Sequence, residues 1–155
     1  MLYRPYKPED FDQLYALEEL CFEPPQRFSR RYMRQIISRA NAATWIAEED
    51  GRLTGFAIVE WREGKHGVTA YIQTIEVAPE ARGRGVGSEL LSRIEGSARG
   101  AGAYLIWLHV EATNAGAIRL YEAHGYACEG RKENYYPQGR AALIYGKRLD
   151  SDGAS

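Results

Sequence analysis

The residues with the clearest chemical potential stand in one short run, Arg82-Gly-Arg-Gly-Val-Gly-Ser88. Three glycines leave the turn without side chains: Gly83, Gly85 and Gly87. Two arginines, Arg82 and Arg84, supply positive charge. Without side chains, a ligand can approach the backbone closely. If a helix follows directly, the unpaired N–H groups of its first turn point at that ligand, and the positive end of the helix dipole lies behind them. The run therefore predicts an anion site that suits a pyrophosphate.

Two other phosphate-binding motifs do not fit this run. A Walker loop requires Gly-Lys-Ser/Thr, whereas Gly87 is followed directly by Ser88. A dinucleotide-binding fingerprint requires its glycines early in a βαβ unit, and here they follow the fourth expected strand. From these residues alone, an exposed turn rich in glycine and arginine remains the alternative.

Hydrophobic periodicity predicts the elements that position this run. Alternating or continuous apolar residues predict seven strands, at residues 2–7, 44–47, 53–61, 68–77, 104–110, 127–133 and 141–148. Helical spacing predicts four helices, which open at residues 8–11, after the cap Ser29, at Ser88 and after the cap Asn114. This order predicts one α/β domain with a mixed, partly antiparallel central sheet flanked by helices.

Two details of this prediction concern the sheet. Residues 2–7 stop at Pro8, which is typical of an edge strand. Residues 104–110 are almost wholly apolar, which predicts a strand buried on both faces. We expect the domain to cover residues 1–149 and residues 150–155 to form a disordered tail.

Composition limits the classes of partner. The length of 155 residues suits one domain, and 20 basic against 21 acidic residues give a formal net charge of -1. That balance argues against wholesale binding of a nucleic-acid backbone. No apolar run is long enough to cross a bilayer, and the N-terminus lacks the order of a signal peptide. We therefore expect neither nucleic acid nor a membrane as a partner.

The cysteines and histidines do not form a metal-binding pattern. Cys21 and Cys128 stand far apart among apolar neighbours, which predicts buried, reduced thiols and suits the cytoplasm. His66, His109 and His124 lack the spacing of metal ligands. We expect no metal cofactor.

The glycine-rich run and its surroundings resemble one enzyme family. Arg82-Gly-Arg-Gly-Val-Gly87 matches the R/Q-x-x-G-x-G/A motif of the GNAT superfamily of acyl-coenzyme A N-acyltransferases. The Val-Ala-Pro run at residues 77–79, the later segment 114–125 and the order of elements are also similar to that family. The resemblance covers about residues 2–149 and implies a GNAT-like α/β fold with acetyl-coenzyme A as co-substrate.

Two further segments indicate a branch of the family. Residues 108–114 and 134–137 resemble the protein N-terminal (Nα) acetyltransferases, which include the bacterial ribosomal-protein alanine acetyltransferases. The implied reaction is direct attack of an amine on the thioester in a ternary complex. The implied acceptor is the N-terminal α-amine of a protein or peptide, with ribosomal proteins among the candidates, in the cytoplasm.

Other acceptors and a different class stay open at this point. A small amine, such as a polyamine, an amino acid or an aminoglycoside, is the alternative substrate. A non-catalytic sensor that binds coenzyme A is the alternative from a class other than enzymes. Tyr121 argues against a sensor, because this residue matches the general-acid position of the family.

The resemblance also implies a cofactor site. The backbone of Ile75, Glu76 and Val77 would pair with the pantetheine arm like an added strand, and the Val77 N–H would stabilise the oxyanion. Residues 83–88, Val86 and Ser88 included, would hold the pyrophosphate through main-chain N–H groups. Asn114 matches a position that touches the cofactor arm, and it is equally suited to cap a helix.

The catalytic groups implied by the resemblance are three. Tyr121 would protonate the departing thiolate, although packing in the core is an alternative role. His109, with Tyr71 on the strand before the glycine-rich turn, would hold a water that accepts the amine proton. Glu111, Glu76 or solvent remain the alternative proton acceptors.

Two turns are the expected acceptor site. The turn between the first two helices contributes Phe22, Pro24 and Pro25, and the late loop contributes Tyr135 and Tyr136. Tyrosines offer hydroxyl groups for the peptide backbone and rings for an apolar slot. From the residues alone, an exposed aromatic turn is the alternative.

Overall fold

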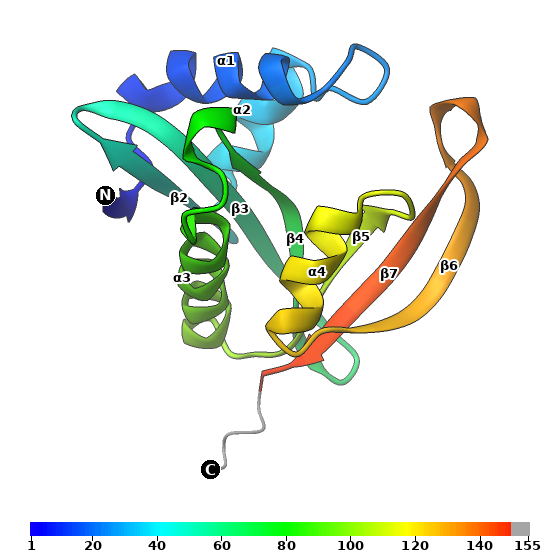
Figure 1. The fold of residues 1–155 in the computed structure, drawn as a ribbon. Coiled ribbons are helices and arrows are strands. Elements are labelled where there is room, and N and C mark those ends of the chain that lie inside the picture. Colours follow the sequence, from blue (N-terminus) through cyan, green and yellow to red (C-terminus); the bar gives the residue numbers. More distant parts are fainter. Residues whose placement is uncertain (150–155) are drawn as a thin grey trace.

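The computed structural model describes residues 1–149 as one α/β domain built on a seven-stranded sheet (Figure 1). The strands are β1 Leu2–Pro5, β2 Ala42–Glu49, β3 Arg52–Gly64, β4 Gly67–Val77, β5 Ala103–Glu111, β6 Ala127–Tyr136 and β7 Arg140–Arg148. The helices are α1 Phe11–Cys21, α2 Arg30–Ser38, α3 Val86–Gly100 and α4 Ala115–Ala123. The predicted fold class is confirmed, whereas the predicted tail at 150–155 lies outside the described residues.

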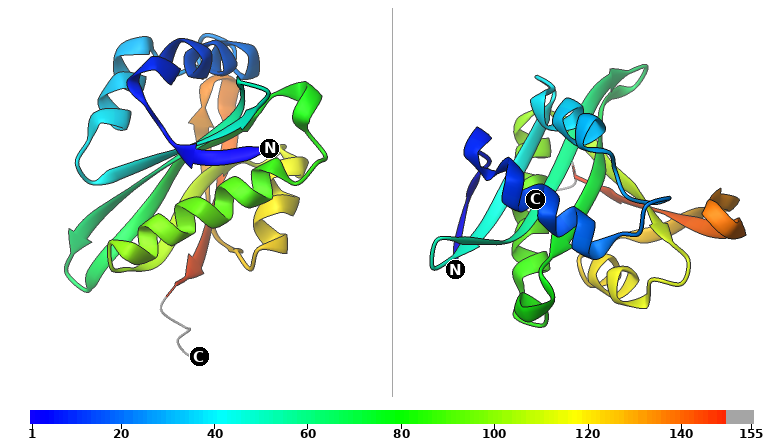
Figure 2. Two further views of the ribbon diagram at one scale, coloured as in Figure 1. Left: turned by 90° about the vertical axis from the view of Figure 1, so that its left-hand side faces the viewer. Right: turned by 90° about the horizontal axis from the view of Figure 1, so that it is seen from above.

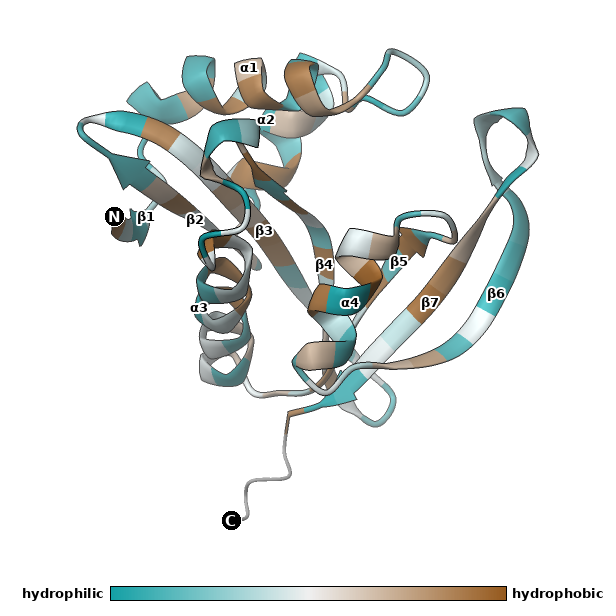
Figure 3. Ribbon diagram, in the orientation of Figure 1, coloured by the Kyte–Doolittle hydropathy of each residue, from teal (hydrophilic) through white to brown (hydrophobic). Residues whose placement is uncertain are grey.

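Helices cover both faces of the sheet and enclose two cores (Figures 1 and 2). Between α1, α2 and the sheet, the largest buried side chains are Phe11, Leu14, Met33, Ile36, Ile46, Phe56 and Ile58. On the other face, α3 and α4 bury Val86, Leu90, Leu91, Ile94 and Tyr121 against Val59, Ile72, Ile106 and Leu108. Figure 3 shows the resulting hydrophobic colours on the central strands and hydrophilic colours along most of the edge strand β6.

Local sequence signals explain most of the element boundaries. Ser29 caps α2, because its side chain accepts a hydrogen bond from the Tyr32 N–H at 3.0 Å. Asn114 caps α4 in the same way through the Ala117 N–H at 3.2 Å. Helix α3 begins at Val86, two residues before the expected start, because Gly85 at φ 82° serves as its N-cap.

The sheet splits where its one parallel pair of strands ends. The order is β1-β2-β3-β4-β5-β7-β6, and only β4 and β5 run parallel. They pair from Val68–Ala103 to Tyr71–Trp107, and beyond Tyr71 the register shows no further partners among the described residues. Strand β4 continues to Val77 along β3, and β5 continues to Glu111 along β7. The edge of β4 that faces β5 is therefore free near residues 72–77, where a ligand can pair with the backbone.

Strand β5 corrects the prediction of a strand buried on both faces. Ile106, Leu108 and Val110 are buried in the core, whereas Trp107 and His109 are only half-buried and line cavities. The apolar composition of this strand does not distinguish its two faces. One face packs in the core, whereas aromatic rings surround a cavity on the other. The alternate residues Trp107, His109 and Glu111 of this strand thus line cavities.

The cysteine prediction is also wrong in part. Cys21 is half-buried at the end of α1, and Cys128 is exposed on β6. Strand β6 lies at the edge of the sheet, and most of its side chains are exposed. No helix within residues 1–149 is long and apolar enough to span a membrane.

Candidate active site

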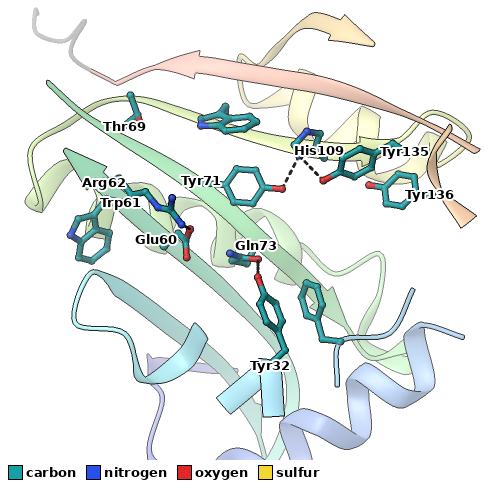
Figure 4. Close-up of a pocket in the computed structure, with 12 residues that line it drawn as sticks. Tyr32, Glu60, Trp61, Arg62, Thr69, Tyr71, Gln73, His109, Tyr135 and Tyr136 are labelled. Atoms are coloured by element: carbon teal, nitrogen blue, oxygen red, sulfur yellow. Dashed lines mark hydrogen bonds and ion pairs between the residues drawn. The ribbon is translucent and has the colours of Figure 1, made fainter. Parts of the chain in front are cut away.

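Three cavities meet at the split in the sheet. A cavity of about 700 Å³, here the glycine-rich cavity, lies between the end of β4, the turn at residues 82–88 and α4. A cavity of about 480 Å³, here the aromatic cavity, lies over β3, β4 and β5 and is drawn in Figure 4. A smaller cavity of about 190 Å³, here the central cavity, shares Ile75, Asn114 and Tyr121 with the first and His109 and Tyr136 with the second. The three cavities therefore adjoin one another along the split.

The glycine-rich cavity has the features of an anion site. Gly85 adopts a left-handed conformation that an L side chain rarely takes, and its carbonyl accepts the Glu89 N–H. The N–H groups of Val86, Gly87 and Ser88 precede that first intrahelical bond and therefore have no acceptor within α3. They lie on the wall of the cavity at the positive end of the helix dipole.

The positive side chains are arranged differently from the sequence expectation. Arg82 lines the cavity, and its Nε donates to the Val77 carbonyl at 2.9 Å, which braces the turn against β4. Arg84 points elsewhere, because its guanidinium pairs with Glu49 at 2.7 Å. Arg119 of α4 lines the cavity instead. The sequence reasoning missed Arg119, although it lies near one helical turn beyond Asn114.

His109 stands at the junction of the central and aromatic cavities (Figure 4). Its Nδ1 lies 2.8 Å from the Tyr71 hydroxyl and 3.4 Å from the Tyr135 hydroxyl, and the Tyr135 ring stacks on it at 4.4 Å between centroids. Its Nε2 is buried and has no hydrogen-bond partner among the described residues. Burial, assisted by the charge of Lys132, lowers the pKa of His109 below its usual value. The imidazole is therefore neutral near pH 7 and can accept a proton.

Tyr121 lies where the glycine-rich and central cavities join. The side chain is buried, and its ring contacts the edge of Tyr126 at 5.5 Å between centroids. Burial raises the pKa of Tyr121 well above its usual value. The phenol therefore keeps its proton at neutral pH and can donate it.

The alternative proton acceptors are both held by other groups. The Glu111 carboxylate lies 3.4 Å from Arg140 Nε and accepts a hydrogen bond from Gln26 Nε2 at 3.3 Å. Glu76 is buried on the α1 side of β4, where it interacts with Glu18 and accepts a bond from the Thr74 hydroxyl at 2.8 Å. Burial and the neighbouring Glu18 raise the pKa of Glu76 well above its usual value. Both carboxylates are thus engaged by neighbouring side chains.

The buried Glu76 should make stability depend on pH. The folded protein holds the Glu76 proton more tightly than the unfolded chain does, because the pKa of Glu76 is higher in the folded state. The free energy of unfolding therefore falls as pH rises from the pKa of the unfolded chain, near 4.3, towards the pKa of the folded protein. Glu76→Gln removes this titration, so the variant should gain stability relative to the parent as pH rises from about 4 to 8. Denaturant melts across that range measure it.

The matched control for that experiment is Glu80→Gln, which changes an exposed carboxylate only four residues away. Its unfolding free energy should follow that of the parent at every pH. Parallel curves for Glu76→Gln and the parent would show that Glu76 keeps an ordinary pKa in the folded chain.

Of the residues expected to bind the acceptor, some line the cavities and others do not. Phe22 lines the glycine-rich and central cavities, and Tyr135 and Tyr136 line the aromatic cavity. Pro24 and Pro25 are exposed in the turn after α1.

Sequence reasoning also missed several residues that line the aromatic cavity, among them Phe28, Tyr32, Gln73 and Trp107. Gln73 and Trp107 stand two residues from Tyr71 and His109, so strand alternation was a signal for both. Within residues 1–149, no group of three or more His, Cys, Asp or Glu side chains is placed to hold a metal ion.

Comparison with known proteins identifies the family. Residues 11–126 match the acetyltransferase (GNAT) family. The chain belongs to this family, which confirms the resemblance noted in the glycine-rich motif, and its named relatives are acetyltransferases.

The relatives act on different acceptors. The chain is 39% identical to streptothricin acetyltransferase of Streptomyces lavendulae over 104 residues, which cover 66% of this chain and 53% of the relative. It is 35% identical to the ribosomal protein bS18-alanine N-acetyltransferase of Salmonella typhimurium over 88 residues, which cover 57% of each. The chain thus spans little more than half the length of both relatives.

A solved structure is similar over nearly the whole chain. NAA60 of Arabidopsis thaliana, determined in complex with a bisubstrate analogue, superposes with a TM-score of 0.83 at 23% identity. The superposition covers 95% of this chain and 97% of NAA60. The similarity confirms the GNAT fold.

Proposed function

We propose that the protein transfers the acetyl group of acetyl-coenzyme A to the N-terminal α-amine of a protein or peptide. The observation that carries this proposal is the set of three adjoining cavities along the split between β4 and β5. It brings an anion site, a buried phenol and a neutral imidazole to the walls of adjoining cavities. The two substrates would enter from opposite sides and meet in the central cavity.

In this proposal, acetyl-coenzyme A occupies the glycine-rich cavity. The free N–H groups at the start of α3 bind the pyrophosphate, and Arg82 and Arg119 add charge. The pantetheine arm pairs at Ile75 with the edge of β4 that faces β5, an edge that has no strand partner there among the described residues; at Val77 the carbonyl is held by Arg82, and the N–H faces the cavity. This arrangement leaves the thioester near Tyr121.

The proton steps follow from the two sides of the central cavity. The acceptor arrives mainly as an ammonium ion, and its proton passes through a water to the neutral imidazole of His109, which the Tyr71 hydroxyl contacts at 2.8 Å. The neutral nitrogen then attacks the thioester carbonyl, and the Val77 N–H stabilises the oxyanion of the tetrahedral intermediate. The attacking nitrogen is positively charged in this intermediate and loses its second proton to water. As the carbon–sulfur bond breaks, Tyr121 donates its proton to the thiolate. Amide and coenzyme A leave, Tyr121 regains a proton from solvent, and His109 returns its own extra proton to solvent.

The choice of a polypeptide acceptor rests on two observations. The aromatic cavity is open along the sheet beyond His109, so a chain that continues past the amine has room. The relative from Salmonella typhimurium modifies an alanine of a ribosomal protein. A ribosomal protein in the cytoplasm is accordingly the partner that we propose.

A small amine is the second candidate acceptor. Streptothricin acetyltransferase is 39% identical over the matched segment, a higher identity than that to the ribosomal-protein enzyme. Both acceptors would use the same cofactor cavity, so only the aromatic cavity distinguishes them.

Release of coenzyme A with a panel of acceptors tests the proposal. The panel contains short peptides with a free α-amine, the same peptides with that amine acetylated, a polyamine, an aminoglycoside and streptothricin. We expect the highest kcat/KM for the free peptides. A higher kcat/KM for any of the small amines would assign the protein to the second candidate, and tight binding of acetyl-coenzyme A without turnover would make it a sensor.

A further inference from the structure

The end of the aromatic cavity away from His109 is built from charged residues of β3. Glu60 and Arg62 line it, on the same face of the sheet as Tyr71 (Figure 4). Glu60 is only 5% exposed, and it forms an ion pair with Arg39 at the end of α2. The ion pair with Arg39 already offsets the desolvation of this buried carboxylate, so Arg62 is not required to neutralise Glu60.

Arg62 is therefore available to a ligand. Its side chain is 73% exposed, and its contact with Glu60 is long at 3.5 Å. Because the guanidinium itself is mostly in solvent and Glu60 keeps its ion pair with Arg39, turning Arg62 towards another carboxylate costs little. A guanidinium favours carboxylates because it can bind both oxygens of the group.

The charges around the cavity favour an anion in the same way. Arg39 and Arg62 oppose the single carboxylate of Glu60, and Lys132 lies 5.9 Å from the centre of the Tyr135 ring beside His109. At the Glu60 end of the aromatic cavity, two guanidinium groups thus face one carboxylate, which leaves an excess of positive charge there. This positive charge does not attract the α-ammonium group of an acceptor peptide. It does attract acidic side chains at the next residues of that peptide.

Arg62 also lies at a suitable distance from the reacting amine. In the β3–β4 register, Glu60 is opposite Tyr71 and Arg62 is opposite Thr69, so Arg62 is a diagonal neighbour of Tyr71. Such neighbours are roughly 7–8 Å apart between Cα atoms. An extended peptide advances about 3.3 Å per residue. With its amine at Tyr71 and His109, the second or third residue would therefore reach Arg62.

We propose that Arg62 selects acceptor polypeptides with an acidic side chain at the second or third residue. This inference rests on the proposed function, because it requires a polypeptide in the aromatic cavity. It assigns Arg62 a role in specificity and none in the chemical step. The selection should therefore appear in KM for the peptide and leave kcat unchanged.

Matched peptides and a charge reversal test the inference. Three peptides share their first residue and carry Glu, Gln or Lys at positions two and three; coenzyme A release gives kcat and KM for each. With the parent protein, we expect kcat/KM to be about threefold higher for the Glu peptide than for the Gln peptide, and lowest for the Lys peptide. Raising the salt concentration should reduce the difference.

The variant Arg62→Glu should reverse that order and make the Lys peptide the best acceptor. Arg99→Glu is the matched control, because Arg99 is exposed on α3 at the other face of the sheet; it should keep the order of the parent. The same order of peptides in Arg62→Glu and the parent, or no preference in the parent, would overturn the inference while leaving the proposed function standing. Acetylation of small amines with no reaction of any peptide would overturn the proposed function itself.

Discussion

Gly85→Asp should abolish binding of acetyl-coenzyme A. Gly85 is the N-cap of α3 at φ 82°, so any L side chain there is strained. Gly85 lines the glycine-rich cavity, and no atom lies within 4 Å of a Cβ built at this position, so the new carboxylate has room beside the free N–H groups. Two negative groups would then compete for the same free N–H groups. Titration calorimetry with acetyl-coenzyme A measures the loss.

The control for this variant is Gly96→Asp, which places the same charge on the same helix. Gly96 is exposed, has no atom within 4 Å of a built Cβ and does not line the glycine-rich cavity. This variant should bind acetyl-coenzyme A as the parent does. Unchanged affinity in a folded Gly85→Asp protein would place the pyrophosphate somewhere else.

His109→Ala should lower turnover by about 10²-fold or more while leaving the affinity for acetyl-coenzyme A nearly intact. The imidazole lies outside the glycine-rich cavity, so its loss affects the proton step and not cofactor binding. Higher pH should partly restore the rate of this variant, because more of the amine is then neutral without help. Turnover measured against pH, with cofactor affinity as the control, gives both results.

Two tyrosine variants separate the proton acceptor from the proton donor. Tyr71→Phe removes the hydroxyl that lies 2.8 Å from His109 Nδ1 and should slow turnover less than His109→Ala does. Tyr121→Phe should also slow turnover, but higher pH should restore it little, because the thiolate still lacks its proton. A His109→Ala protein as active as the parent near pH 7 would leave solvent, Glu111 or Glu76 as the acceptor.

The elements and the family could be predicted from the sequence, because each rests on local patterns. The caps Ser29 and Asn114 are where their residue types indicate, and the glycine-rich run introduces α3 as its motif implies. The pairing of Tyr71 with His109, 38 residues apart, followed from the resemblance, and the structure brings the two side chains within hydrogen-bond distance.

What the sequence did not predict depends on how distant segments pack. The apolar composition of β5 indicated burial on both faces, because Trp107 has the same hydropathy whether it packs in a core or lines a cavity. Arg84 was expected at the anion site because of its position in the motif, but Glu49 of β2, 35 residues away, binds its guanidinium. The stacking of Tyr135 on His109 and the contact of Glu18 with Glu76 likewise join elements with no common sequence signal.

The site of acetylation within one peptide tests the central claim most directly. A peptide with a free α-amine and an internal lysine is incubated with the protein and acetyl-coenzyme A, and mass spectrometry locates the new acetyl group. The α-amine has a pKa near 8 and the lysine one near 10.4, so far more of the α-amine is neutral at pH 7. The same peptide with a blocked α-amine should remain almost unmodified. We expect acetylation at the α-amine, and acetylation mainly at the lysine would contradict the account.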